Sequence, residues 1–168
     1  MNVLHKVRDG LMRILGAAAI FLFAVMTVVG TWQIVSRYVF NSPSTVSEEL
    51  LTYSFAWMAL LSSAYVFGRR EHMRMAFLAN KFHGGARKFL ELLGEVFSFA
   101  FAAVVMAYGG VEITKLTMTQ VTASLQIPMG YVYVVLPVTG FLIMFFSLVN
   151  AMDTLAANFT DDFSEKEA

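Results

Sequence analysis

The sequence predicts an all-α integral membrane protein with four transmembrane helices. Of its 168 residues, 58% are hydrophobic and 14% are charged, whereas an ordinary soluble domain has about 45–50% and about 25%. The apolar residues form four long segments, and about 20 such residues are needed to cross a hydrocarbon core about 30 Å thick. These segments do not alternate in polarity, which argues against a transmembrane barrel.

The four expected spans follow one another with short polar connections. The first covers about residues 14–35 and the second about 50–67, and neither contains a charge. The third covers about 89–110 and the fourth about 129–149. We expect the first span to stay in the protein, because it is longer than the apolar core of a signal peptide, about 7–15 residues. The chain would then be a single membrane domain, residues 1–168, with a polar tail over 150–168.

The distribution of Lys and Arg predicts that both termini are cytoplasmic. Basic residues gather in the N-terminal flank and between the second and third spans, where Arg69, Arg70 and Arg74 lie. Each of the other two connections has a single basic residue, Arg37 in the first and Lys115 in the second. Because positive charge stays on the cytoplasmic side, these two connections should face outward. We expect Arg69, Arg70 and Arg74 to determine topology and to contact anionic lipids.

The residues that would make the chain an enzyme are missing from the sequence. It has no phosphate-binding glycine loop and no visible pairing of a nucleophile with a base. It has no cysteine, and none of its three histidines form an i, i+4 pair. Its net charge is zero, so no overall field attracts nucleic acid. We therefore expect no catalytic residue, no metal, no cofactor and no nucleic-acid partner.

Two carboxylates, Glu91 and Glu95, lie within the third expected span and on one helical face. A carboxylate facing lipid costs about 3 kcal/mol or more, so this face should meet protein or water. Glu91 would pair with Arg87 or Lys88 near the cytoplasm, and the alternative is a proton or ion relay. Small residues at four-residue spacing favour close helix packing here. The packing and interface candidates are Trp57, Glu91, Gly94, Glu95, Ser98 and Ala102.

The connection between the first two spans has a turn-forming and helix-capping sequence. Residues 41–43 are typical of a turn. Thr45 with Glu48 fits a capping box, and Ser47 is an alternative cap. Each of these residues alone is therefore explained by a well-capped re-entry into the membrane.

Taken as one string, this region resembles a known family. Arg37-Tyr38, Phe40-Asn41 and Ser47-Glu48-Glu49-Leu50, followed by an aromatic-rich span with Trp57, resemble the small membrane subunit of tripartite ATP-independent periplasmic (TRAP) transporters, the DctQ-like family. Residues 70–74 and 124–128 resemble two further segments of that family, so the resemblance covers about the whole chain.

The resemblance implies a secondary transport system of the bacterial inner membrane. A periplasmic binding protein captures an organic acid, such as a dicarboxylate, a sialic acid or another sugar acid. A large membrane subunit carries the substrate and sodium sites and moves by an elevator-like mechanism. The small subunit packs against the static scaffold of the large one and does not carry the transport site.

We therefore expect a non-catalytic scaffold subunit of a sodium-coupled TRAP transporter. Its partners would be the large membrane subunit, the periplasmic binding protein and membrane lipids. One alternative is a self-sufficient homo-oligomeric exporter with Glu95 as the proton carrier, and another is an assembly or sensor protein without transport. Docking candidates at the outer surface, for which local pairing is the rival explanation, are Arg37, Tyr38, Asn41, Ser47, Glu48 and Glu49.

Overall fold

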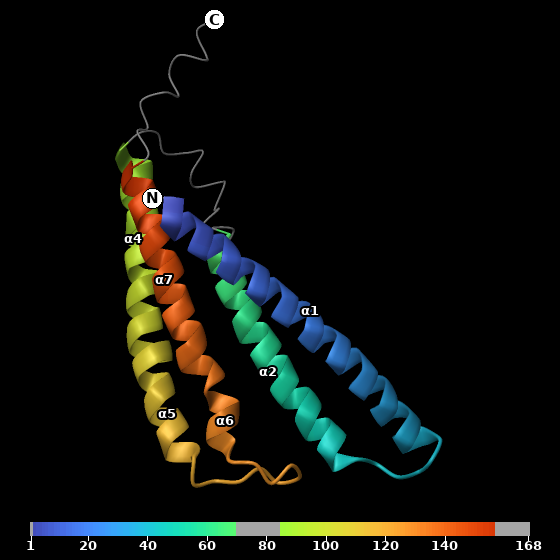
Figure 1. Ribbon diagram of the computed structural model, residues 1–168. Helices are drawn as coiled ribbons and strands as arrows, with labels where there is room; N and C mark the ends of the chain where they lie inside the picture. The colour runs from blue at the N-terminus through green and yellow to red at the C-terminus, as the bar shows by residue number, and fades with distance from the viewer. Residues whose placement is uncertain (1, 70–84, 157–168) are drawn as a thin grey trace, which may run out of the picture.

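The structure is a computed structural model that describes residues 2–69 and 85–156, and it confirms the predicted four-helix membrane architecture. Helices α1 (Asn2–Tyr38) and α2 (Thr45–Gly68) form one hairpin (Figure 1). The second hairpin pairs two rods made of consecutive helical pieces. The third rod consists of α4 (Gly85–Phe101), the π-helical segment η2 (Ala102–Tyr108) and α5 (Gly109–Thr117), and the fourth rod consists of α6 (Met129–Tyr133) and α7 (Val135–Ala156).

Four helical stretches in the described residues are long and apolar enough to cross a membrane. They are Leu4–Tyr38, Thr45–Gly68, Phe89–Thr117 and Met129–Leu155. Each includes one of the expected spans and continues beyond it, because hydropathy locates the apolar part of a helix and misses the polar turns that extend it. Threonine hydroxyls inside α1 bond to backbone carbonyls of the same helix. Thr27 Oγ1, for example, donates to the Phe23 carbonyl oxygen at 2.9 Å.

The connection before α2 shows which residue caps that helix. Asn41 has a φ of 50°, in the left-handed region that turns favour. The N-cap is Ser44, whose Oγ accepts from the backbone N–H of Ser47 at 3.3 Å. Both predicted caps are therefore wrong, because Thr45 lies one residue after the observed cap and Ser47 lies three residues after it. The helix begins at Thr45, so the cap falls on the residue directly before it, Ser44.

Helix α7 is central and packs against α2, α4 and η2. Glycines allow its closest approaches to the third rod. A Cβ added at Gly140 would lie 2.7 Å from the backbone nitrogen of Ala107 in η2, and one at Gly110 would lie 2.9 Å from Pro137 Cδ. The buried core that results contains Leu15, Leu61, Ala64, Ala102, Met106, Val135, Ile143 and Phe146.

The fourth rod is interrupted at Val134, between α6 and α7. Pro137 follows three residues later and has no N–H to donate within the helix. A side chain from the other hairpin bonds to a backbone carbonyl beside this break. Trp57 Nε1 donates to the Val132 carbonyl oxygen at 3.0 Å. Trp57, a predicted packing residue, thus joins α2 to the interrupted rod.

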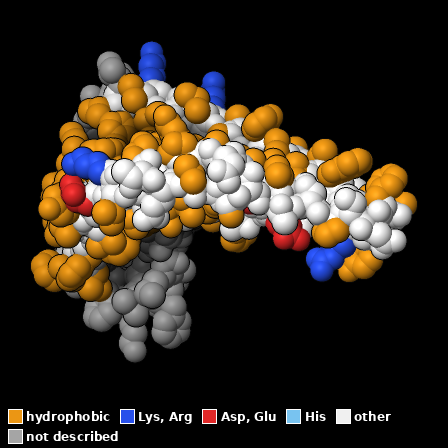
Figure 2. All heavy atoms as spheres, turned by 90° about the horizontal axis from the view of Figure 1, so that it is seen from below, with side chains coloured by type: hydrophobic (Ala, Val, Ile, Leu, Met, Phe, Trp, Pro, Cys, Tyr) orange, Lys and Arg blue, Asp and Glu red, His pale blue; other side chains and the backbone are white. Residues whose placement is uncertain are grey.

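The exposed surface along the spans is apolar. Figure 2 shows hydrophobic side chains covering much of the face seen from the end where the helices are connected by loops. Large side chains with most of their surface exposed include Ile20, Phe21 and Val28 on α1, and Phe89, Phe97 and Leu116 on the third rod. In a membrane this surface faces lipid or another apolar helix.

Candidate functional sites at the two ends of the helices

Residues 39–44 and 118–128 connect the helices at one end of the molecule, which we call the loop end (Figure 1). The opposite end, where α1 begins and α7 finishes, is the terminal end. Sequence analysis placed its docking candidates at the loop end, and the packing candidates along α2 and the third rod.

At the loop end, the Glu49 carboxylate binds two separate segments of the chain. Its Oε1 accepts from the Tyr53 hydroxyl at 2.6 Å, one turn further along α2. Its Oε2 accepts from the backbone N–H groups of Ser124 and Leu125 at 2.8 and 2.9 Å. Charge-assisted bonds of this kind are roughly twice as strong as neutral ones. Glu49 therefore holds the 118–128 loop against the beginning of α2.

The other docking candidates divide into exposed and enclosed residues. Arg37, Tyr38, Asn41 and Glu48 are exposed, and Arg37 Nη1 lies 3.8 Å from Glu48 Oε1. Ser47 is buried and its Oγ lies 3.0 Å from the capping Ser44 Oγ. Adjacent glutamates thus have opposite surroundings, with Glu48 directed to solvent and Glu49 bonded inside the chain.

The 118–128 loop is ordered by its own hydrogen bonds. Thr122 N–H donates to the Ile127 carbonyl at 2.9 Å, and Ile127 N–H donates to Thr122 Oγ1 at 3.2 Å. Met129 N–H donates to the Gln120 carbonyl at 2.8 Å. Gln126 takes a φ of 53° at the tip. The turn thus closes on the fully buried Thr122.

An apolar groove of about 240 Å³ lies beside this loop. Leu22 of α1, Trp57 of α2 and Tyr131 of α6 contribute to its walls, and Leu125 and Ile127 come from the loop. The groove therefore lies between the two hairpins, along the part of α2 that follows Glu49.

Glu95 is buried between the third rod and α7, with 3% of its surface exposed. The Ser147 hydroxyl lies 2.6 Å from its Oε2 and 2.8 Å from its carbonyl oxygen. Glu91, one turn earlier, is half-buried. Its predicted pairing with Arg87 or Lys88 lies outside the described side chains. Among the small-residue candidates, Ala102 is fully buried, and Gly94 and Ser98 are half-buried.

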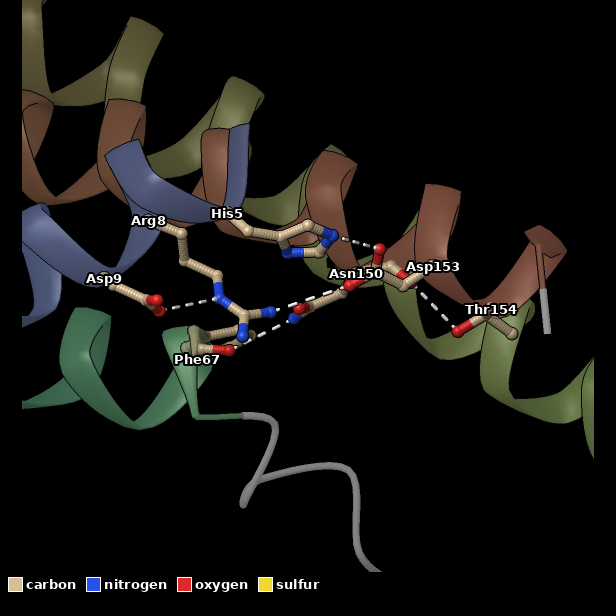
Figure 3. A network of polar contacts seen from close by, with 7 residues as sticks. All are labelled: His5, Arg8, Asp9, Phe67, Asn150, Asp153 and Thr154. Atoms are coloured by element: carbon tan, nitrogen blue, oxygen red, sulfur yellow. Dashed lines mark hydrogen bonds and ion pairs between the residues drawn. The ribbon is translucent and has the colours of Figure 1, made fainter. Parts of the chain in front are cut away.

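At the terminal end, a polar network joins three helices (Figure 3). The Asp153 carboxylate of α7 contacts two side chains of α1. Its Oδ1 lies 3.3 Å from His5 Nε2, and its Oδ2 lies 3.6 Å from Arg8 Nη1. Asn150, also on α7, donates from Nδ2 to the Phe67 carbonyl near the end of α2 at 3.1 Å. Sequence analysis missed this network, because its members are separated by many residues and no local pattern relates them.

The basic residues between the second and third spans are only partly described. Arg69 lies over the Tyr65 ring, with its guanidinium carbon 5.2 Å from the ring centroid. Arg70 and Arg74 lie outside the described residues, and so do His72 and His83. Among the residues that the structure does describe, no group of three His, Asp or Glu side chains could hold a metal ion.

Comparison with known proteins identifies the family. The family model of the tripartite ATP-independent periplasmic transporters, DctQ component, matches residues 26–157. The chain belongs to this family. It is 29% identical over 150 residues to the sialic acid TRAP transporter small permease protein SiaQ of Vibrio cholerae, covering 86% of this chain and 82% of the relative. It is 21% identical over 136 residues to a protein of Haemophilus influenzae provisionally named a TRAP transporter small permease, covering 81% and 84%.

As a TRAP small permease, the chain is a transporter subunit and not an enzyme. Family membership and four apolar helices together make it a multi-pass protein of the inner membrane. The resemblance found in residues 37–57 is thereby confirmed at the level of the family.

Proposed function

We propose that this TRAP small permease is the scaffold subunit of a sodium-coupled transporter for an organic acid. It would anchor a large membrane subunit that carries the substrate and sodium, and it would help to receive a periplasmic binding protein. The sialic acid named for the Vibrio relative makes a sialic acid or another sugar acid the first substrates to test, followed by dicarboxylates.

The observation that carries the scaffold proposal is the distribution of polar groups. A site for an organic anion needs polar groups or helix N-termini near the middle of the membrane. Trp57 Nε1 and the Ser147 hydroxyl instead bond to the chain's own helices. The exposed faces of α1 and the third rod are apolar and suit packing against another membrane protein. This supports a role in holding another subunit, with transport carried out elsewhere.

The positions of exposed charges support an orientation and a docking surface. Lys6 and Arg13 are exposed near the beginning of α1, which favours a cytoplasmic terminal end. The loop end would then face the periplasm and present Arg37 and Glu48 beside Tyr38 and Asn41. Arg69 would meet anionic lipid on the cytoplasmic side.

Co-purification tests the scaffold proposal. A tagged full-length chain should recover a larger multi-span membrane protein when it is extracted from membranes of its own organism in mild detergent. Vesicles containing both subunits, supplied with the binding protein, should take up sialic acid only with a sodium gradient, and vesicles with this chain alone should be inactive. Recovery of no larger membrane partner contradicts the proposal.

The burial of Glu95 is the observation that favours a second candidate function, that of a self-sufficient proton-coupled exporter. In that case Glu95→Gln abolishes transport by the chain alone, because the carried proton has no carboxylate to bind. In a scaffold, Glu95→Gln leaves an amide that can still bond Ser147, so uptake by the complete complex should persist. The two variants Glu95→Gln and Ser147→Ala, measured in the same vesicles, separate chemistry at the carboxylate from packing at the contact.

A further inference from the structure

We infer that Glu49 is a positioning residue: it fixes the 118–128 loop against α2 and so sets the shape of the surface offered to the binding protein. The inference rests on the proposed function for the identity of the partner. The hold of Glu49 on the loop rests only on geometry described above.

Each carboxylate oxygen of Glu49 has a separate task. Oε1 is bonded to Tyr53 of its own helix at 2.6 Å, which fixes the direction of the side chain. Oε2 is bonded to two consecutive backbone N–H groups, those of Ser124 and Leu125. These donors lie 75 and 76 residues further along the chain. A carboxylate has two acceptor oxygens and can therefore serve both sides at once.

The segment that Glu49 holds has the properties of a preformed contact surface. Its internal bonds close the turn on Thr122. Its outer side chains are apolar and open, with Val121 60% and Met118 41% exposed. Exposed apolar groups on a rigid segment are typical of interaction sites, because little conformational entropy is lost when a partner binds. The loop contains no charged residue, so shape would decide the fit more than charge does.

The second outer connection adds to the same surface. Tyr38, the last residue of α1, and Phe40 are 75% and 63% exposed, and the 39–44 connection lies at the same end of the molecule as the 118–128 loop (Figure 1). Glu49 lies in the first turns of α2, directly after this connection. Because α2 continues directly from this connection, the bonds of Glu49 keep the 118–128 loop beside it, and a binding protein would meet the two as one surface.

The neighbouring glutamate provides a matched control. Glu48→Gln and Glu49→Gln make the same chemical change at consecutive positions, but Glu48 is exposed and its contact is Arg37 at 3.8 Å. In full-length protein in nanodiscs, Glu49→Gln should speed hydrogen exchange of the Ser124 and Leu125 amides several-fold, because a neutral amide oxygen accepts more weakly than a carboxylate. Glu48→Gln should leave both amides unchanged. Tyr53→Phe should give a smaller acceleration, because Oε2 stays in place.

The functional measurement is made on the complete transporter. Glu49→Gln should weaken binding of the purified binding protein at least several-fold, while recovery of the large subunit stays at the wild-type level. Unchanged amide exchange in Glu49→Gln, or an equal acceleration in Glu48→Gln, would overturn the inference. So would faster exchange with unchanged binding. If wild-type protein recovers no large subunit at all, the proposed function fails, and the exchange data still decide whether Glu49 holds the loop.

Discussion

At the scale of single residues, the direction in which a helix presents a polar side chain decides what that side chain does. Glu48 and Glu49 are identical in chemistry, and the sequence made both of them docking candidates, with local pairing as the rival explanation. One pairs loosely with Arg37, and the other supports a loop 75 residues away. The difference is one step of about 100° around the helix, which turns Glu49 toward the second hairpin.

The serine that caps α2 provides a residue-scale prediction. Ser44→Ala should destabilise the protein by about 0.5–2 kcal/mol, because the N–H of Ser47 loses its acceptor at the start of the helix. The lower thermal unfolding midpoint can be measured in detergent by circular dichroism. Thr45→Ala is the matched control, since Thr45 is exposed and follows the cap. A larger fall in the unfolding midpoint for Thr45→Ala than for Ser44→Ala would contradict the Ser44 cap and support the capping box predicted from the sequence.

At the scale of helices, sequence located the spans well and their irregularities poorly. The spans are readable because the cost of placing each residue in hydrocarbon is local and accumulates along a segment. The fourth span is broken at Val134, three residues before Pro137. The π-helical segment Ala102–Tyr108 had no such signal. It lies against Gly140, and that contact depends on how two rods pack.

The contacts that build the candidate sites were also beyond the sequence. The spacing of Glu49 and Tyr53 permits an i, i+4 bond, and this half of the Glu49 site was readable in principle. Its other partners, Ser124 and Leu125, donate backbone N–H groups, which any residue possesses. No residue type therefore marks them, and only the fold brings them to α2.

The contact between η2 and α7 provides an element-scale prediction. Gly140→Ala should destabilise the protein by about 1–3 kcal/mol, because the new methyl would lie 2.7 Å from Ala107 N and 2.9 Å from Met106 Cβ. Gly10→Ala is the control, since no atom lies within 4 Å of a Cβ at that position. It should be neutral or stabilising by up to about 1 kcal/mol, as alanine favours helix. Equal midpoints for the two variants would contradict this account of the packing.

At the scale of the whole molecule, two hairpins are joined by polar contacts near both ends. The Glu49 and Trp57 bonds join them at the loop end and beside it, and Asn150 bonds to the end of α2 at the terminal end. Asp153 adds the beginning of α1 to this set. Polar contacts near both ends thus hold the two hairpins together as one unit.

The terminal network provides a prediction at this scale. Asp153→Asn should free the beginning of α1, because His5 and Arg8 lose the negative charge that they share. The chain has no cysteine, so after the substitutions Lys6→Cys and Met152→Cys a thiol-reactive spin label attaches only at these two positions. Their distance distribution should broaden in Asp153→Asn. Asp9→Asn, which alters only a 3.8 Å contact of Arg8 on the exposed side, should change it less. An unchanged distribution in Asp153→Asn would show that apolar packing alone fixes α1.

The length of α1 has a mechanical consequence. Its 37 residues make a rod about 55 Å long, roughly 20 Å longer than the 24-residue α2 to which it is connected. Only the middle of α1 is apolar, and its first turns carry Lys6, Arg8 and Arg13, so the extra length would project from the lipid at the terminal end. There it meets Asp153, near the end of α7, through His5 and Arg8. A truncation that removes these turns should therefore leave the apolar span whole and release α1 from the fourth helix.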